Sequence, residues 1–414
     1  MKIIKRDSYL EELASVEGTP DIKVITGIRR SGKSTLLRDF VSRVIERNPQ
    51  TNLISVDFNL LDNEVLQDYH ALNDYVIAHT VPGTPNMIAI DEVQMCHGFE
   101  KAVNSWHASG NYDIYLTGSN AFLLSSDLAT LFTGRTFSVQ VYPFSLQEFM
   151  KYFELSDPSQ ALERYVQEGG MAGSYIYYNE QRRAQYLADI FNTLVLRDIC
   201  QRHQLRRSNA LDRITDFLID NIGNLSSARK ISGALTSSGL KITDKTVSQY
   251  IDYLREAFAF YKVRRYDTRG KRYLTSGDKY YLADHAFRYA LLGTRNFDYG
   301  HVYENIVAIE LLRRGYQLYV GMLPTRSQSE SQEAGDQGAA EIDFVAVRGS
   351  EKIYFQVSDD ISSPQTFQRE CASLLAVRDA YPRVLLANTH HPTYDYEGVR
   401  VTDLATWLSK PESA

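Results

Sequence analysis

The sequence contains few cysteines, and their positions exclude two classes of stabilised fold. Its three cysteines, Cys96, Cys200 and Cys371, lie far apart in a chain of 414 residues. They show none of the paired spacing that is typical of a disulfide framework or a zinc site. We therefore expect reduced thiols, as in a cytoplasmic protein, and no disulfide or zinc scaffold.

Long apolar runs are missing as well. No stretch reaches the ~18 consecutive apolar residues that a membrane helix needs. The basic start, Met1 to Asp7, is not followed by the apolar stretch of a secretory signal. The sequence therefore predicts a cytoplasmic protein with no membrane partner.

An excess of positive charge is also absent. The chain has 45 Lys and Arg residues against 51 Asp and Glu residues, which gives a formal net charge of -6. A protein that binds nucleic acid over its whole surface would be basic, so any DNA contact is expected to be a local patch. The composition, with 43% hydrophobic and 23% charged residues, is typical of a folded chain of two or three domains.

The amino-terminal part alternates short apolar segments with helical patterns, which is typical of a parallel sheet covered by helices. Four strands are predicted, at Ile22–Thr26, Leu53–Phe58, Met87–Ile90 and Ile114–Thr117. Each ends where polar residues begin, and α/β sheets of this kind bind ligands at the carboxyl ends of their strands. The predicted fold class is therefore α/β, with its ligand site at that edge.

A glycine-rich segment follows the first predicted strand and opens a helical pattern. Its residues are Gly27, Ile28, Arg29, Arg30, Ser31, Gly32, Lys33, Ser34 and Thr35. The spacing G-x-x-x-x-G-K-S between a strand and a helix is that of a P-loop, whose N–H groups surround phosphate oxygens. The lysine reaches the β- and γ-phosphates and the serine hydroxyl joins the Mg²⁺ shell. The segment Gly27–Thr35 is therefore predicted to bind ATP, with Ser34 as a Mg²⁺ ligand.

Two acids end the third predicted strand. Asp91 is expected to hold Mg²⁺, and Glu92 is expected to act as the general base toward the attacking water. Ser119 and Asn120 follow the fourth strand, where a polar group would contact the γ-phosphate or this water, although both are also ordinary turn residues.

An arginine often completes the neutralisation of charge in nucleotide hydrolysis. Arg135, after Gly134, is our candidate, acting in its own chain or in a neighbouring one. A solvated or ion-paired arginine is the alternative interpretation, and Arg29 and Arg30 of the loop would also serve.

In this order and spacing, the motifs resemble those of prokaryotic AAA-type ATPases that carry a carboxy-terminal domain of unknown function. Besides the P-loop, the resemblance rests on Ile90–Gln94, Leu116–Asn120, Gly134–Arg135, Tyr142–Ser145 with Glu148–Phe149, Glu168–Gly170 and Leu196–Ile199. It implies a P-loop ATPase domain over 1–150, a helical region over 151–210, a winged-helix-like module over 211–299 and a small restriction-endonuclease-like α/β domain over 300–414.

The implied nuclease-like domain departs from the pattern of active enzymes, in which two carboxylates hold a metal and a lysine supports the nucleophile. Asp343 and Glu304 fit the carboxylate positions. The next strand, however, reads Gln356-Val357-Ser358 where an acid and a lysine are expected. A neutral glutamine is a weak metal ligand, and a serine cannot replace an ammonium group. We therefore predict a domain without nuclease activity.

The expected function is ATP hydrolysis with Mg²⁺, coupled to a rearrangement of domains. ATP is favoured over GTP because the sequence lacks an Asn-Lys-x-Asp segment. The alternative is a nucleotide-gated module with slow turnover that binds DNA or a protein, or assembles with itself. A nuclease is a further, less favoured alternative. Arg264, Arg265 and the basic residues of 269–272 would contact DNA, although in an acidic chain a solvated run of charge is the favoured interpretation. A small-molecule kinase would not need the large carboxy-terminal part.

Overall fold

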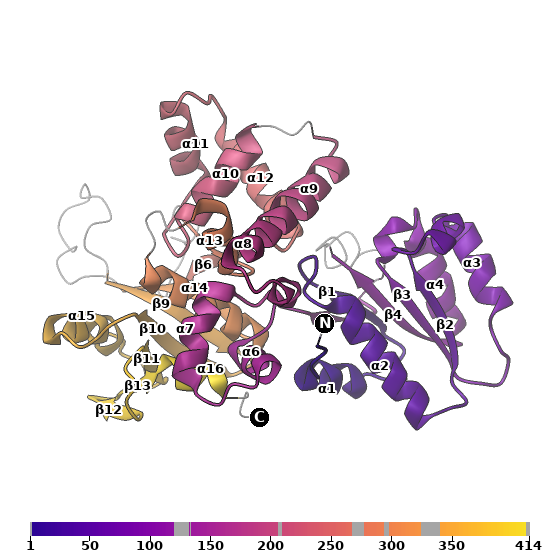
Figure 1. Ribbon diagram of the computed structural model, residues 1–414, viewed down its shortest axis with the longest axis horizontal. Coiled ribbons are helices and arrows are strands. Elements are labelled where there is room, and N and C mark those ends of the chain that lie inside the picture. Colours follow the sequence, from indigo (N-terminus) through magenta and orange to yellow (C-terminus); the bar gives the residue numbers. More distant parts are fainter. Residues whose placement is uncertain are drawn as a thin grey trace. The chain divides into compact units, whose positions relative to one another are not determined.

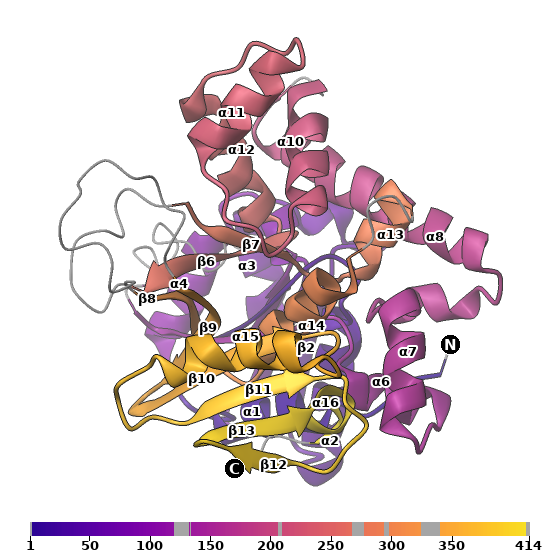
Figure 2. The same cartoon turned by 90° about the vertical axis from the view of Figure 1, so that its left-hand side faces the viewer.

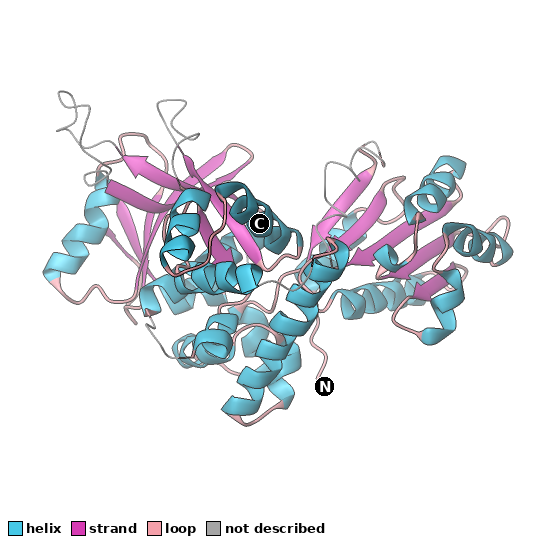
Figure 3. Ribbon diagram, turned by 90° about the horizontal axis from the view of Figure 1, so that it is seen from above, coloured by secondary structure: helices cyan, strands magenta, loops and turns pink. Residues whose placement is uncertain are grey.

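The computed structural model describes residues 2–119, 132, 134–205, 209–266, 277–293, 298–323 and 340–410. The chain forms two compact units. The amino-terminal unit contains Ile3–Pro143 and Glu256–Phe258, and the carboxy-terminal unit contains Met1–Lys2, Phe144–Arg255 and Ala259–Ala414. The strands form two separate sheets (Figure 3). None of the helices in the described ranges is both long enough and apolar enough to cross a membrane.

The amino-terminal unit contains a five-stranded parallel sheet in the order β2-β3-β4-β1-β5 (Figure 1). Its strands are β1 (Ile22–Thr26), β2 (Asn52–Asp57), β3 (Asn86–Asp91), β4 (Tyr112–Gly118) and β5 (Thr136–Gln140). Every residue of β1 and β3 is buried, because both faces of these strands are covered. The predicted α/β sheet and its four strands are thus confirmed, and β5 is an additional edge strand.

Helices cover both faces of this sheet. They are α1 (Asp7–Ser15), α2 (Lys33–Arg47), α3 (Tyr69–Ala78) and α4 (Phe99–Ser109), with short turns η1 (Leu61–Leu66) and η2 (Val93–Met95). Successive residues of a strand point to opposite faces. Ile25 accordingly packs with α1 and α2, whereas Val24 packs with α3 and α4. The loop after β1 lies between these two layers at the carboxyl edge of the sheet.

The carboxy-terminal unit begins with helices. They are α6 (Leu146–Phe153), α7 (Pro158–Glu168), η4 (Ala172–Ile176), α8 (Glu180–Asp189), the π-helical η5 (Ile190–Leu196), α9 (Arg197–Arg202), α10 (Asn209–Asp220), α11 (Ala228–Ser237), α12 (Asp244–Glu256) and α13 (Ala286–Leu292). Ser145 and Glu148 form a capping box at the start of α6. Thr243 caps the start of α12, where its Oγ1 accepts a hydrogen bond from the amide of Thr246 at 3.2 Å.

An eight-stranded mixed sheet completes this unit, in the order β12-β13-β11-β10-β9-β8-β6-β7 (Figure 2). Its strands are β6 (Phe260–Tyr266), β7 (Lys279–Leu282), β8 (Gln317–Leu323), β9 (Ala340–Arg348), β10 (Glu351–Ser358), β11 (Arg383–Ala387), β12 (Tyr394–Tyr396) and β13 (Val399–Asp403). Strand β6 pairs with β7 and also, in parallel, with β8. Residues on both sides of position 299 therefore contribute to one sheet.

Three further helices accompany this sheet, α14 (Tyr299–Arg313), α15 (Pro364–Leu375) and α16 (Leu404–Ser409). Tyr354 of β10 packs in the core formed with α15, whereas the ring of its neighbour Phe355 lies 5.7 Å from that of Trp407 in α16. Because these two residues point to opposite faces, α15 and α16 cover opposite sides of the sheet. The segment from Ser327 to Ala340 is rich in Ser, Gln, Glu and Gly, a composition that predicts a flexible surface loop. It lies outside the described residues except for Ala340.

Candidate nucleotide site

The P-loop curves around the end of β1 in a backbone conformation that requires glycine. Gly27 has φ 139°, and a Cβ atom there would lie 2.1 Å from the carbonyl oxygen of Val141. The amide of Val141 in turn donates to the carbonyl of Thr26 at 2.7 Å. Gly32, with φ 99°, precedes the first residue of α2. The loop is therefore held closely against the end of β5, and the amino end of α2 follows it directly.

Lys33 is buried, and its ammonium group lies within the loop. Its Nζ donates to the carbonyl oxygens of Gly27 at 3.0 Å and Ile28 at 3.1 Å. Burial lowers the pKa of Lys33 to about 8, while the nearby carboxylates of Glu92 and Asp91 oppose this effect. A phosphate group beside this ammonium would favour its charged form.

The serine hydroxyls of the loop are placed for two different contacts. Ser31 is buried, and its Oγ has no hydrogen-bond partner among the described residues. Ser34 makes a side-chain hydrogen bond with Asp91. Thr35 and Arg29 are half-buried, and the other loop arginine is exposed. The structure thus joins the loop to the carboxylate at the end of β3.

Thr117 of β4 links the two predicted catalytic acids. Its Oγ1 donates to Oδ1 of Asp91 and accepts a hydrogen bond from the amide of Glu92 at 3.0 Å. Glu92 has φ 54°, a strained conformation for a residue with a side chain. Burial raises the pKa of Asp91, although hydrogen bonds from Thr117 and Ser34 act against the rise. One hydroxyl therefore positions both acids next to the loop.

The Glu92 carboxylate is contacted by two polar side chains. The hydroxyl of Ser119 donates to its Oε2 at 3.2 Å, and the amide of Gln94 donates to the same oxygen. The structure thus brings predicted Ser119 to the general-base candidate, and adds Gln94. Asn120 lies outside the described residues.

Arg135 is placed at the opposite edge of the sheet. It precedes β5, and its carbonyl accepts a hydrogen bond at 2.8 Å from the amide of Ile22, the first residue of β1. The P-loop follows the last residue of β1, which is about 15 Å away at the usual strand rise. The structure therefore does not bring Arg135 to the P-loop of its own chain. Its side chain is exposed.

Sequence reasoning missed Thr117 and an arginine before α1. Arg6 is buried and donates to the carbonyls of Ser31 at 3.0 Å and Tyr142 at 2.9 Å. Its guanidinium lies 4.5 Å from the centre of the Tyr9 ring, and the Tyr9 hydroxyl accepts from the amide of Tyr142 at 3.2 Å. Arg6 therefore fastens the P-loop to the end of β5. Nothing in its sequence context distinguishes it from a surface arginine.

Two family descriptions match this chain. The first, "AAA domain", matches residues 19–150, and the second, "Domain of unknown function (DUF8612)", matches residues 159–298. The first match and the five-stranded parallel sheet identify the amino-terminal unit as an AAA-type domain. This part of the resemblance is confirmed, whereas the winged-helix-like and nuclease-like parts stay predictions.

An uncharacterized protein of Haemophilus influenzae is 34% identical over 413 residues, which cover 98% of each chain. The chain belongs to the family of this Haemophilus influenzae protein. The uncharacterized protein MJ1544 of Methanocaldococcus jannaschii is 26% identical over 328 residues, 76% of this chain and 70% of that protein. The AAA-type domain is thus one part of a longer architecture that the first relative shares along its length.

Solved structures resemble the chain more remotely. The Walker-type ATPase PABY2304 of Pyrococcus abyssi has 18% identity and a TM-score of 0.45, covering 70% of this chain and 96% of that one. AMPPCP-bound DnaA from Aquifex aeolicus has 15% identity and a TM-score of 0.31, covering 62% and 90%. Such low TM-scores carry no conclusion about the function of this chain.

The side chains of the AAA-type domain fit a magnesium ion that arrives with a nucleotide. A hydroxyl and a carboxylate, those of Ser34 and Asp91, are oxygen ligands of the kind Mg²⁺ prefers. Within the described ranges, no group of three or more His, Cys, Asp or Glu side chains is arranged to hold a metal by itself. The phosphates would therefore have to supply further ligands.

The lowered pKa of Lys33 predicts a pH dependence of nucleotide binding. Binding of a polyphosphate favours the ammonium form, so protonation of Lys33 must accompany binding above pH 8. We expect the affinity for a non-hydrolysable ATP analogue to fall between pH 8 and pH 9.5, approaching about tenfold per pH unit. Calorimetry in two buffers of different ionisation enthalpy would detect the proton uptake. A flat affinity over this range would show that Lys33 is already fully charged in the free protein.

Proposed function

We propose that this chain binds ATP at Gly27–Thr35 and hydrolyses it with Mg²⁺, and that turnover changes the arrangement of its two units. The observation that carries the proposal is the contact chain from Ser34 through Asp91 and Thr117 to Glu92. These contacts support the assignment of Ser34 and Asp91 as a metal-binding pair and of Glu92 as a general base beside one loop. Phosphoryl transfer needs chiefly such positioning and charge stabilisation.

Each described residue has a distinct role in the proposed reaction. Lys33 and the N–H groups of the loop bind the phosphates, and Ser34 and Asp91 would hold Mg²⁺, which supplies charge neutralisation when bound. Glu92 accepts a proton from the attacking water, because its carboxylate is fixed by Ser119 beside the loop. These roles use a carboxylate, an ammonium and hydroxyls that the structure gathers at one sheet edge.

Arg135 is proposed to act on the nucleotide of a second copy of the chain. The support is its exposed side chain and its place at the sheet edge opposite the P-loop. Assembly of copies would bring the amino edge of one sheet to the carboxyl edge of the next. An arginine supplied in this way typically raises turnover by about 10³-fold or more.

Two substitutions separate binding from hydrolysis. Lys33→Ala removes the phosphate-binding ammonium, so we expect it to lose both ATP binding and phosphate release. Glu92→Gln keeps the size and hydrogen-bonding capacity of the side chain but removes the base, and should lower phosphate release by about 100-fold or more while retaining ATP. Nucleotide binding and phosphate release are measured on the same preparations.

The matched control is Arg47→Ala. Arg47 is an exposed arginine at the end of α2 far from the P-loop, where it pairs with Glu17, and its removal should leave turnover unchanged. Equal phosphate release by the parent, Lys33→Ala and Glu92→Gln would contradict the proposal.

The proposed action of Arg135 on a second copy has its own test. Mixing Glu92→Gln with Arg135→Ala chains should restore part of the turnover, because one chain keeps the base and the other keeps the arginine.

A second candidate function is nucleotide-gated binding of DNA by helices α10 to α12. These three helices precede the β6–β7 hairpin, the order of elements in a winged helix. Basic residues are exposed on α11 and just before and within α12, namely Arg229, Lys230, Lys241 and Lys245. The predicted contacts at 269–272 lie outside the described residues. Asp244 and Asp252 on α12 weaken the local positive charge.

Neutralisation of these four residues tests the second candidate. If they contact phosphates, replacing all four by Gln should weaken duplex binding and flatten the plot of log affinity against log salt by about 3 to 4 units of slope. Fluorescence anisotropy between 50 and 200 mM salt, roughly the range in which such contacts weaken strongly, measures this. A parent chain that binds no duplex with ATP or without it eliminates the second candidate.

A further inference from the structure

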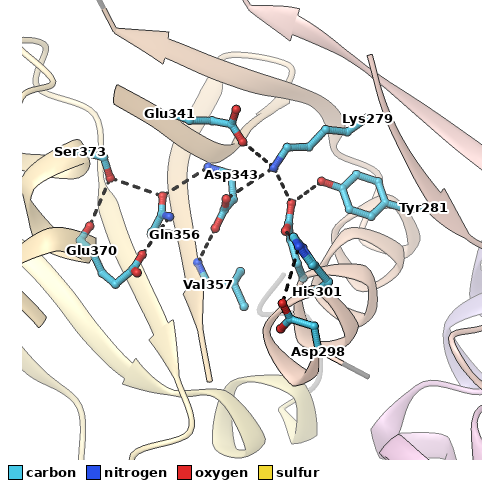
Figure 4. A network of polar contacts seen from close by, with 11 residues as sticks. Lys279, Tyr281, Asp298, His301, Glu341, Asp343, Gln356, Val357, Glu370 and Ser373 are labelled. Atoms are coloured by element: carbon cyan, nitrogen blue, oxygen red, sulfur yellow. Dashed lines mark hydrogen bonds and ion pairs between the residues drawn. The ribbon is translucent and has the colours of Figure 1, made fainter. Parts of the chain in front are cut away.

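Four ionisable side chains meet inside the carboxy-terminal unit (Figure 4). Nζ of Lys279 lies 2.7 Å from Oε1 of Glu304, 2.7 Å from Oε1 of Glu341 and 3.6 Å from Oδ1 of Asp343. Lys279 belongs to β7, Glu304 to α14, and the other two acids to β9. One ammonium group therefore binds carboxyl groups from a helix and a strand that are not its neighbours in sequence.

The backbone of β9 helps to bring the acidic side chains to Lys279. Between the pairs Tyr319–Val345 and Gly321–Ile342, β9 advances by one residue more than β8. The extra residue is a β-bulge at 343–344, a feature that redirects side chains. The second oxygen of Asp343 accepts a hydrogen bond from the amide of Val357 at 2.9 Å. Both oxygens of Asp343 thus have contacts within the protein.

Glu304 is enclosed from every described side. The Tyr281 hydroxyl donates to its Oε1 at 2.6 Å, and Nδ1 of His301 lies 3.4 Å from its Oε2. A Cβ atom on Gly223 would lie 2.8 Å from the same Oε2. The Lys279 side chain is only 3% exposed. Oε1 of Glu304 is therefore directed at the ammonium and not at solvent, whereas the Glu341 side chain is 33% exposed.

The remaining residues expected in a nuclease site are engaged elsewhere. The Gln356 carbonyl accepts from the amide of Asp343 at 3.3 Å and from the Ser373 hydroxyl at 3.4 Å, and its Nε2 donates to Glu370 at 3.1 Å. The Ser358 hydroxyl donates to the carbonyl of Asp360 at 3.2 Å. A divalent ion beside Asp343 would find no second ligand from β10. The side chains of β10 consequently do not complete a nuclease metal site.

The charges of the cluster agree with this geometry. Burial alone would lower the pKa of Lys279, but Glu304, Asp343 and Glu341 raise it above its usual value. Burial would raise the pKa of Glu304, and Lys279 and His301 lower it. Burial first, and then Glu304, raises the pKa of Asp343 to about 8. Lys279 therefore keeps its charge opposite an ionised Glu304, whereas Asp343 takes up a proton below about pH 8.

We propose that the Lys279 ammonium is a built-in cation that takes the place of a divalent metal between Glu304, Glu341 and Asp343, so that the cluster joins β7, α14 and β9 and binds no metal. Lys279 thereby ties the β6–β7 hairpin to the carboxy-terminal strands. Strand β10 lacks the lysine of an active nuclease, and Lys279 of β7 instead brings an ammonium group to the acids. This ammonium binds the carboxyl groups directly and does not support a metal-bound water.

Lys279→Met tests this proposal through stability. The substitution keeps most of the side-chain volume and leaves the buried carboxylates without their cation, which is strongly destabilising. We expect the Tm to fall by about 5 °C or more. We also expect millimolar Mn²⁺ to restore much of this loss by occupying the vacated centre, and to leave the parent chain within about 1 °C. The experiment uses the full chain without nucleotide in an Asp91→Asn background, so that the P-loop site does not contribute.

The matched control is Lys262→Met, which removes an ammonium on β6 that lies 2.6 Å from a single carboxylate, that of Asp278. This variant should show a smaller fall in Tm and no response to Mn²⁺. A response to Mn²⁺ equal to that of Lys279→Met would mean that the metal acts elsewhere. A Lys279→Met chain that folds but is indifferent to Mn²⁺ would overturn the proposal.

A direct binding measurement keeps the proposal testable if Lys279→Met does not fold. Calorimetric titration of the Asp91→Asn chain with Mn²⁺ should detect no stoichiometric site. A site that is present in this chain and lost on adding Asp343→Asn would show that the cluster holds a metal despite Lys279. Neither experiment involves ATP turnover, so each outcome is independent of the proposed ATPase function.

Discussion

The hydroxyl of Thr117 is the contact on which the candidate nucleotide site depends. It joins the carboxylate of Asp91 to the backbone of Glu92, and Asp91 reaches the loop through Ser34. β3 and β4 must be adjacent and parallel for this to occur, since Thr117 comes from β4 and both acids from the end of β3. The core on the two faces of the sheet fixes that adjacency, and thereby fixes the position of Glu92, the proposed general base.

The sequence predicts this site well where local pattern and chemistry coincide. The loop Gly27–Thr35 is recognisable because its glycines, lysine and serine follow a buried strand, and Asp91 and Glu92 because they end another. Strand β5 was missed because an edge strand of Thr, Phe, Ser, Val and Gln lacks a continuous apolar run. Thr117 and Arg6 were missed because their roles depend on which strands and loops lie side by side. No local sequence pattern predicts these spatial neighbours.

In the carboxy-terminal unit, too, a contact between residues distant in sequence could not be predicted from the sequence. The sequence suggests Glu304 and Asp343 as partners, and the structure brings them to one centre. Lys279, however, lies in a short strand beside two tyrosines, where a lysine reads as a surface residue. The pairing of β6 with β8 and the hydrogen bonds between Leu282 of β7 and Asn305 of α14 bring the β6–β7 hairpin, and this ammonium with it, to those acids. The two acidic centres thus differ in one respect: one is bordered by hydroxyls and a phosphate-binding loop, and the other by its own cation.

The most direct test of the account is the rate of phosphate release by Thr117→Val compared with Thr117→Ser. Valine keeps the shape of the threonine side chain but makes neither hydrogen bond, whereas serine keeps the hydroxyl. We expect both chains to retain ATP binding. The valine chain should release phosphate about tenfold more slowly or worse, and the serine chain should stay within about threefold of the parent. Equal rates for the valine chain and the parent would contradict the account.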